Sequence, residues 1–244
     1  MEQPENYKKI FVGLYDSLMN MEYYSDWENW LNSTIKKYNI PKNNAIDLAC
    51  GTGKIAEILE KLGFSVLCID NSEEMLKKAK IRLKDRKCTF IQKDMTNFEL
   101  STDYSLVTCF YDSVNYLLEL EKVNNMMKNV SKALKKGGYF LLDINTKEKI
   151  KYLQKKPFAV SEVGPYKVKF IHRGKENFWN LEIKIIDKNN EEFTEKHIER
   201  GYDLNEIVSS AKLANLELLE SKEEVKQTNE GKFPSRIYFV FKKI

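Results

Sequence analysis

The spacing of apolar positions changes twice along the chain, and these changes divide it into three regions. Residues 6–39 carry aromatic side chains at helical spacing, among them Tyr7, Phe11 and Tyr15, which predicts two helices. From residue 45, short apolar runs alternate with segments of helical period, which predicts βαβ units and a parallel sheet. The predicted strands of this second region are residues 45–49, 66–69, 88–91, 106–110 and 139–144.

Two signals mark helix ends in this second region. Ser72, followed by Met75 and Leu76, predicts an N-cap that opens a helix. Gly137 and Gly138 follow a segment of helical period, so we expect them to end a helix before the fifth strand.

After Asn145 apolar and polar residues alternate. Residues 166–170 and 179–185 each present one apolar and one polar face, which is typical of half-buried antiparallel strands, and a further strand ends near Arg200. A helix over 204–214 and strands over 216–221 and 236–241 follow. We therefore predict an α/β domain from residues 1–145 and 201–244, in which residues 1–40 form a helical cap. Residues 146–200 would form an inserted antiparallel sheet above the ligand crevice.

Composition excludes several classes of protein. The 244 residues are 42% apolar, and 40 Lys+Arg against 36 Asp+Glu give a net charge of +4 without a concentrated basic stretch, which argues against a nucleic-acid partner. The chain opens on a polar segment and has no apolar run long enough for a membrane span, so we expect a cytoplasmic protein. Its four cysteines lack zinc-site spacing, so we expect free thiols and no metal. No feature indicates an oligomeric state.

A glycine turn follows the first predicted strand of the second region. Gly51 and Gly53 lie between this strand and a helix, where glycine lets a ligand approach the bare backbone. Together with Ala56 they also fit the dinucleotide-binding pattern, so the glycines alone leave a nicotinamide-dependent oxidoreductase or a non-catalytic nucleotide sensor open.

Three acidic residues narrow the choice of ligand. Asp47 precedes the turn by four residues, where it would repel a pyrophosphate but attract an ammonium or sulfonium group. Asp70 ends the next strand, placed to accept hydrogen bonds from ribose hydroxyls, and Asp94 follows the third strand, placed to meet an adenine amino group. Each could instead cap the following helix. Together the three acids favour a pocket for S-adenosylmethionine.

The segment from Asp47 to Gly53 and its spacing to Asp70 and Asp94 resemble motifs I, II and III of class I methyltransferases. Residues 15–19 and 197–200 resemble small stand-alone bacterial members that act, where known, on small molecules. The resemblance implies a Rossmann-like, seven-stranded, mostly parallel sheet whose last strand is antiparallel. Ala49 departs from the commonest motif I, in which a third glycine often stands.

The resemblance also implies contacts for each part of the cofactor. The methionine part would lie on Asp47, Ala49, Gly51 and Gly53, the ribose on Asp70 near Ser72 and Met75, the adenine between Asp94 and Met95, and the sulfonium above Phe110. Tyr15 and Trp27 would belong to a lid, because the N-terminal helices of the relatives fold over the cofactor; the other interpretation is that they pack in the core.

Candidates for the chemistry follow the fourth strand of the second region. Tyr111, Asp112, Asn115 and Tyr116 could orient an acceptor, or form only the turn into the next helix. His197 is the better of two histidines as a general base, although surface histidines are common on such strands. Cys109 reads as a packed strand residue. Methyl transfer needs alignment and exclusion of water more than a catalytic signature.

The function predicted from the sequence is methyl transfer from S-adenosylmethionine to a small-molecule acceptor. The alternative is a methyltransferase that acts on RNA or protein. The oxidoreductase and the non-catalytic sensor are more remote.

Overall fold

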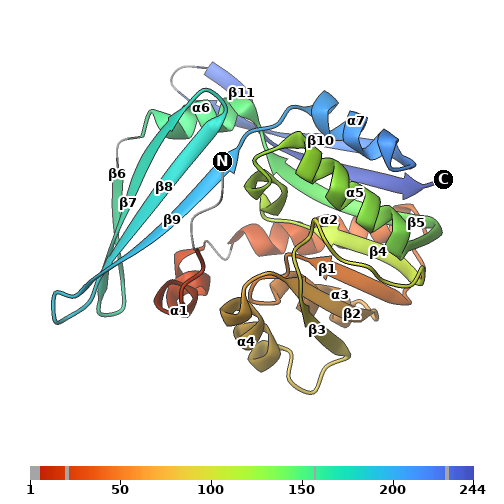
Figure 1. Ribbon diagram of the computed structural model, residues 1–244, viewed down its shortest axis with the longest axis horizontal. Helices are drawn as coiled ribbons and strands as arrows, with labels where there is room; N and C mark the ends of the chain where they lie inside the picture. Colours follow the sequence, from red (N-terminus) through yellow and green to blue (C-terminus); the bar gives the residue numbers. More distant parts are fainter. Residues whose placement is uncertain (1–5, 20–21, 157, 229–230) are drawn as a thin grey trace.

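The computed structural model describes residues 6–19, 22–156, 158–228 and 231–244, so part of the predicted 1–40 cap lies outside the described residues. Its larger unit is a seven-stranded sheet in the order β10-β11-β5-β4-β1-β2-β3 (Figure 1). Every neighbouring pair is parallel except those of β11, which confirms the predicted mostly parallel sheet and its antiparallel last strand. The strands are β1 (Asn44–Leu48), β2 (Ser65–Asp70), β3 (Cys88–Gln92), β4 (Tyr104–Cys109), β5 (Leu134–Asn145), β10 (Leu216–Thr228) and β11 (Gly231–Lys243).

Helices cover both faces of this sheet, which is why its central strands are apolar on both sides. On one face α5 (Leu120–Ala133) and α7 (Leu204–Leu213) pack against side chains such as Leu48 and Leu142. On the other face α2 (Glu22–Lys37), α3 (Lys54–Lys61) and α4 (Glu73–Arg82) enclose a second core. No helix of the described residues is long and apolar enough to cross a membrane.

The prediction that Gly137 and Gly138 end a helix is wrong. Helix α5 ends at Ala133, and both glycines lie inside β5. Tyr104 of β4 faces Leu134 and Leu106 faces Tyr139, so extra residues of β5 bulge out of register between these pairs. Gly137 has a φ of +77°, and a Cβ on Gly138 would lie 3.1 Å from the Tyr104 carbonyl oxygen. The two glycines therefore permit a bulge rather than a helix end.

The second sheet is antiparallel, with strands in the order β6-β7-β8-β9, and it is the small separate sheet that the alternating pattern predicted. Its strands are β6 (Phe158–Val163), β7 (Tyr166–Lys175), β8 (Phe178–Ile186) and β9 (Glu192–Arg200). The pattern did not predict β6 or helix α6 (Lys147–Gln154), which links the two sheets. Strand β6 is almost wholly exposed and α6 buries only Ile150, so neither has the one-sided apolar pattern of a core element.

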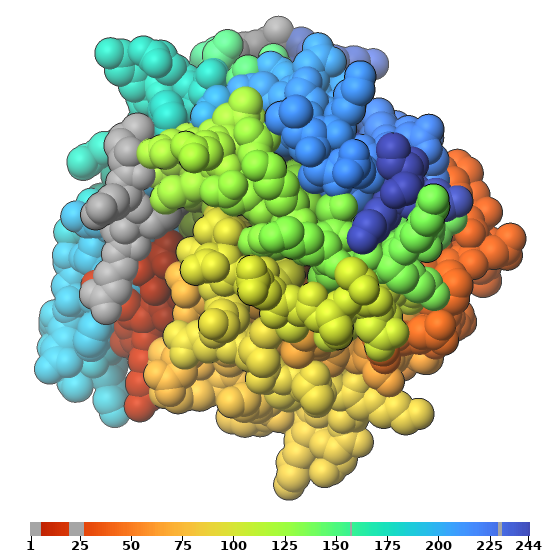
Figure 2. Space-filling view, turned by 45° about the vertical axis from the view of Figure 1, so that its right-hand side comes forward, coloured from red at the N-terminus to blue at the C-terminus, as the bar shows by residue number. Residues whose placement is uncertain are grey.

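Helix α1 (Lys9–Leu18) covers the apolar face of the small sheet. Phe11 is buried among Val168, Ile183 and Ile185 of β7 and β8. Helix α1 also contacts α4 and β6, and Figures 1 and 2 show it between the small sheet and the main domain. The two predicted amphipathic strands thus complete their core with the N-terminal helix.

Candidate functional site

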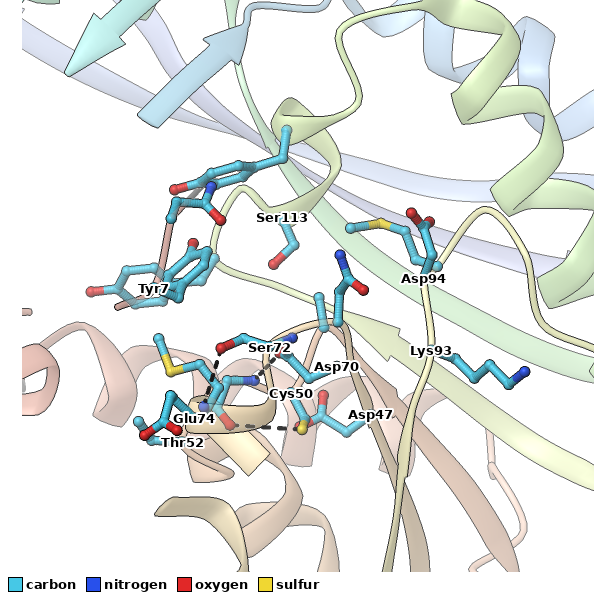
Figure 3. Close-up of a pocket in the computed structure, with 18 of the residues that line it drawn as sticks. Tyr7, Asp47, Cys50, Thr52, Asp70, Ser72, Glu74, Lys93, Asp94 and Ser113 are labelled. Carbon is cyan, nitrogen blue, oxygen red and sulfur yellow. Dashed lines mark hydrogen bonds between the residues drawn. The ribbon is translucent and has the colours of Figure 1, made fainter. Parts of the chain in front are cut away.

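A pocket of about 750 Å³ opens at the carboxyl ends of β1, β2 and β4. Figure 3 shows Tyr7 on one side of it and Lys93 and Asp94 on the other, with Asp70 and Ser72 between them. The sequence-predicted residues that line it are Tyr15, Asp47, Ala49, Gly51, Asp70, Ser72, Met75, Asp94, Met95, Phe110, Tyr111 and Tyr116. Among the predicted candidates, Trp27, Gly53, Asp112, Asn115 and His197 do not line it.

The two glycines of the turn, Gly51 and Gly53, are needed for different reasons. Gly51 has a φ of +53°, and a Cβ there would meet nothing within 4 Å, so its face toward the pocket is open. Gly53 has a φ of +82°, and a Cβ there would lie 2.9 Å from Leu83 Cδ1. Gly53 therefore lets α3 approach α4, whereas Gly51 exposes backbone to the pocket.

Asp70 ties the glycine turn to the turn that follows β2. Its Oδ2 accepts the Gly51 N–H and its Oδ1 accepts the Ser72 N–H, each at 2.8 Å. Ser72 itself is the N-cap of α4 and accepts the Met75 N–H at 3.3 Å, which confirms the predicted cap. Asp70 is therefore not the helix cap. Burial raises its pKa, and the two backbone hydrogen bonds oppose that shift.

Asp47 is a buried carboxyl at the floor of the pocket. Its Oδ1 accepts the Thr108 hydroxyl at 2.9 Å, whereas its Oδ2 has no hydrogen-bond partner among the described residues. Burial raises the pKa of Asp47 to about 7. A buried oxygen without a donor fits a cationic ligand group, because such a group would supply the missing hydrogen bond.

Asp94 differs from the other two acids because it is exposed. Strand β3 ends at Gln92, and Asp94 Oδ1 accepts both the backbone N–H and the hydroxyl of Thr96 at 2.7 Å. This places Asp94 and Met95 at the open rim of the pocket.

The residues after β4 divide between the pocket and the structure behind it. Phe110 and Tyr111 line the pocket, and Trp27 packs behind them with ring centroids 6.1 and 4.6 Å away. Trp27 is thus a core residue behind the pocket wall. Asp112 accepts a hydrogen bond from Arg236 at 2.6 Å, so its carboxylate is held outside the pocket.

His197 lies on β9, 3% exposed, with its Nδ1 3.0 Å from the Tyr116 hydroxyl. Tyr116 and Tyr7 line the pocket and separate His197 from it. Burial lowers the pKa of His197 to about 4. None of the described residues that line the pocket comes from residues 146–200. The small sheet therefore does not line the pocket itself, and it reaches the pocket wall only through its contacts with the N-terminal segment and Tyr116.

Sequence reasoning missed the contacts that fasten α1 to the cofactor side. Asp16 accepts the Thr52 hydroxyl at 2.8 Å and pairs with Arg82 of α4. The Lys78 ammonium donates to the Gly13 carbonyl at 2.9 Å. No local pattern signals these contacts, because each joins residues more than 30 positions apart.

The known proteins that this chain is similar to are methyltransferases. Residues 45–138 match the family model described as a methyltransferase domain. A Geobacillus sp. (strain WCH70) protein named as a methyltransferase is 34% identical over 146 residues, which span 59% of either chain. The protein YqeM of Bacillus subtilis (strain 168), also named as a methyltransferase, is 29% identical over 94% of either chain.

A solved structure extends the match to the whole fold. The S-adenosylmethionine-dependent methyltransferase from Clostridium acetobutylicum ATCC 824 superposes with a TM-score of 0.81 over 96% of each chain, at 25% identity. The pocket at the carboxyl edge, with its glycine turn and its unpartnered buried carboxylate oxygen, fits that cofactor. Residues 45–138 thus match a methyltransferase domain, and the fold of the whole chain is similar to that of an S-adenosylmethionine-dependent methyltransferase.

Proposed function

We propose that this protein transfers the methyl group of S-adenosylmethionine to a small molecule held between the glycine turn and Tyr7. The observation that carries the proposal is the continuity of the pocket. One cavity of about 750 Å³ is lined both by the glycine turn and by Tyr7 and Tyr116. Figure 3 shows Tyr7 on the side of this cavity opposite Lys93 and Asp94. This volume lies in the range of small-molecule sites, roughly 300–1,000 Å³.

Each acid has a defined part in holding the cofactor. Asp47 Oδ2 would accept the methionine ammonium, because it is buried and lacks another donor. Asp70 would accept hydrogen bonds from the ribose hydroxyls, while its carboxylate also accepts the Gly51 and Ser72 N–H groups and so fixes the glycine turn. Asp94 and Met95 would border the adenine at the rim, and Ser72 and Met75 would lie beside the ribose.

The chemistry asks little of the protein beyond alignment. The methyl carbon forms a bond to the acceptor atom while its bond to sulfur breaks, and the electron pair of that bond stays on sulfur as S-adenosylhomocysteine. Phe110 and Tyr111, which follow β4 and line the pocket, would contact the reacting groups and keep water from them. The acceptor would lie beside Tyr7, Ser113 and Tyr116, which line the same pocket.

A relative supports an acceptor of this size. The dTDP-3-amino-3,4,6-trideoxy-alpha-D-glucopyranose N,N-dimethyltransferase of Streptomyces venezuelae is 32% identical over 101 residues, 41% of this chain. The balanced charge of the chain adds to this, because no basic stretch favours a nucleic acid.

Two measurements test the proposal. Calorimetry should show binding of S-adenosylmethionine and S-adenosylhomocysteine but not of NAD or NADP. Radiolabelled cofactor should then transfer its methyl group to components of a bacterial metabolite extract, whereas a matched extract of RNA or of protein should stay unlabelled. Binding of NAD alone would contradict cofactor use, and labelling confined to RNA or protein would contradict the small-molecule acceptor.

A further inference from the structure

Four side chains form a continuous polar chain between the pocket and the small sheet. The Tyr7 hydroxyl shares a hydrogen bond with the Tyr116 hydroxyl, which lies 3.0 Å from His197 Nδ1. His197 Nε2 lies 3.7 Å from Glu195 Oε1. Tyr7 and Tyr116 line the pocket, while His197 and Glu195 are 3% and 1% exposed. The chain therefore begins at the acceptor side of the pocket and ends in a buried carboxyl group.

Glu195 also holds the main chain of the N-terminal segment. Its Oε1 accepts the Tyr7 N–H, and its Oε2 accepts the Lys8 N–H at 3.3 Å. Tyr7 is thus bound to β9 twice, through its backbone to Glu195 and through its hydroxyl by way of Tyr116 and His197. The aromatic ring of Tyr7 also packs edge-on to His197, with centroids 5.2 Å apart. This arrangement fixes the Tyr7 ring at the pocket wall.

The position of the ring proton of His197 follows from its neighbours. Because burial lowers its pKa to about 4, His197 is neutral at pH 7 and carries a single ring proton. Its Nε2 makes no hydrogen bond with the described residues and faces Glu195. Both Glu195 oxygens accept backbone N–H groups, so Glu195 faces Nε2 as an acceptor, which a proton on Nε2 attracts and a lone pair there would repel. The proton therefore belongs on Nε2, and Nδ1 is a hydrogen-bond acceptor.

This tautomer sets the direction of the whole chain. A phenol has one proton, so the Tyr116 hydroxyl must donate to His197 Nδ1. The Tyr7 hydroxyl must then donate to the Tyr116 oxygen. Burial raises the pKa of both tyrosines, so both keep their protons. All protons of the chain point away from the pocket, and the Tyr7 oxygen has only lone pairs left for a ligand.

We propose that the Tyr7–Tyr116–His197–Glu195 chain selects acceptors that have a proton to donate. The acceptor would be a neutral amine or a hydroxyl group, and its proton would be donated to the Tyr7 oxygen. A carboxylate has no proton to donate and would set its lone pairs against those of Tyr7. The donated proton also orients the nucleophile, because it aims one bond of the acceptor atom at Tyr7 and leaves a lone pair for the methyl carbon. Tyr7 and Tyr116 touch the acceptor, and His197 and Glu195 are positioning residues. The inference rests on the proposed function.

The tautomer of His197 can be measured without knowing the acceptor. Nitrogen-15 NMR of the full chain distinguishes protonated from unprotonated ring nitrogens. The chain has only two histidines, so His172→Gln leaves His197 as the single signal set. His172 stacks on Trp179, and it does not line the pocket. We expect the proton on Nε2, and a change in the Nδ1 shift in Tyr116→Phe. A proton on Nδ1 in the wild type would overturn the inference.

A transfer assay tests the selection itself. Radiolabelled S-adenosylmethionine is offered with a panel of small amines, alcohols, phenols, carboxylic acids and thiols of similar size. We expect methylation of nitrogen or hydroxyl oxygen, and we expect Tyr116→Phe to lower kcat about tenfold, the factor of one hydrogen bond, with cofactor affinity unchanged. His197→Asn, which keeps an acceptor for Tyr116, should retain more activity than His197→Leu. His172→Gln is the matched control.

The possible outcomes separate the two proposals. Methylation confined to carboxylic acids or to thiols, or a Tyr116→Phe variant as active as the wild type, would overturn the inference and leave the methyltransferase function standing. Failure of the wild-type protein to bind S-adenosylmethionine would instead overturn the proposed function. The NMR measurement on the wild type decides the direction of the chain even if the variants do not fold.

Discussion

The two sides of the pocket are built in different ways. On the cofactor side, Asp47, Gly51 and Asp70 lie at strand ends and in the turns beside them. The Asp70 carboxylate joins the two turns by accepting the Gly51 and Ser72 N–H groups, each at 2.8 Å. On the proposed acceptor side, Tyr7, Tyr116 and His197 come from three parts of the chain, which meet where β9 contacts the turn after β4 and the N-terminal segment. The cofactor side is thus set by local segments of a parallel sheet, whereas the acceptor side depends on long-range contacts.

The largest expected effect breaks the packing on which the acceptor side depends. Phe11→Ala should lower the free energy of unfolding by about 3–5 kcal/mol, because a buried ring is lost and a cavity remains among Val168, Ile183 and Ile185. Denaturant unfolding measures this change, and hydrogen exchange should rise first in α1 and β7. Ile81→Ala on α4, where the side chain is 77% exposed, is the control. An unchanged unfolding midpoint for Phe11→Ala would show that α1 is not held on the small sheet.

The next effect concerns the cofactor side alone. Asp70→Asn removes the negative charge that accepts the Gly51 and Ser72 N–H groups and the proposed ribose hydroxyls. Because hydrogen bonds to charged groups contribute roughly 1.5–3 kcal/mol, we expect cofactor affinity to fall about tenfold or more by calorimetry. Asp103→Asn tests a carboxylate that is bonded to Asn44 and does not line the pocket. If the folded Asp70→Asn protein binds as tightly as the wild type, Asp70 has a structural role only.

A pH effect of similar size follows from Asp47. Burial raises its pKa from 3.8 to about 7, so the folded protein without ligand favours the protonated form. Its contribution to stability therefore declines as the pH rises from about 4 to 7. Cofactor binding should act in the opposite direction, because an ammonium group favours the carboxylate and binding releases a proton. We expect affinity to rise between pH 5 and 7, by up to about tenfold per unit.

Calorimetry in buffers of different ionisation enthalpy should reveal that released proton at pH 6. Asp47→Asn is the control, since it removes the titrating group and should flatten the pH dependence. If the wild-type affinity stays constant between pH 5 and 7, Asp47 does not bind the ammonium group.

The smallest effect tests the departure from the commonest glycine pattern. Ala49 has a φ of +57°, a left-handed conformation that costs a residue with a Cβ about 1–2 kcal/mol. Ala49→Gly removes this cost but adds freedom to the unfolded chain, so we expect a change in unfolding free energy within about 1 kcal/mol. Thermal unfolding checks it. A larger loss of stability would indicate that the Ala49 methyl group packs in the fold.

The sequence by itself determined the main sheet and the cofactor side. Strands buried on both faces give continuous apolar runs, and the carboxyl ends of parallel strands meet at one edge, so Asp47, Asp70 and the glycine turn could be placed together from their order alone. The same pattern predicted the small sheet. It erred at Gly137, because a bulge inside a strand and a helix end both call for a glycine of positive φ.

Only the tertiary structure decided which residues lie on the proposed acceptor side of the pocket. Trp27 and Phe11 share a helical aromatic pattern, yet one packs behind Phe110 and the other on the small sheet. His197 was visible as a histidine on a strand, but its neutral state and its link to Tyr7 through Tyr116 arise from burial and from contacts across 81 positions or more. Periodicity reports which face of an element is buried, not which partner covers it, and the partner decides what each side chain can do.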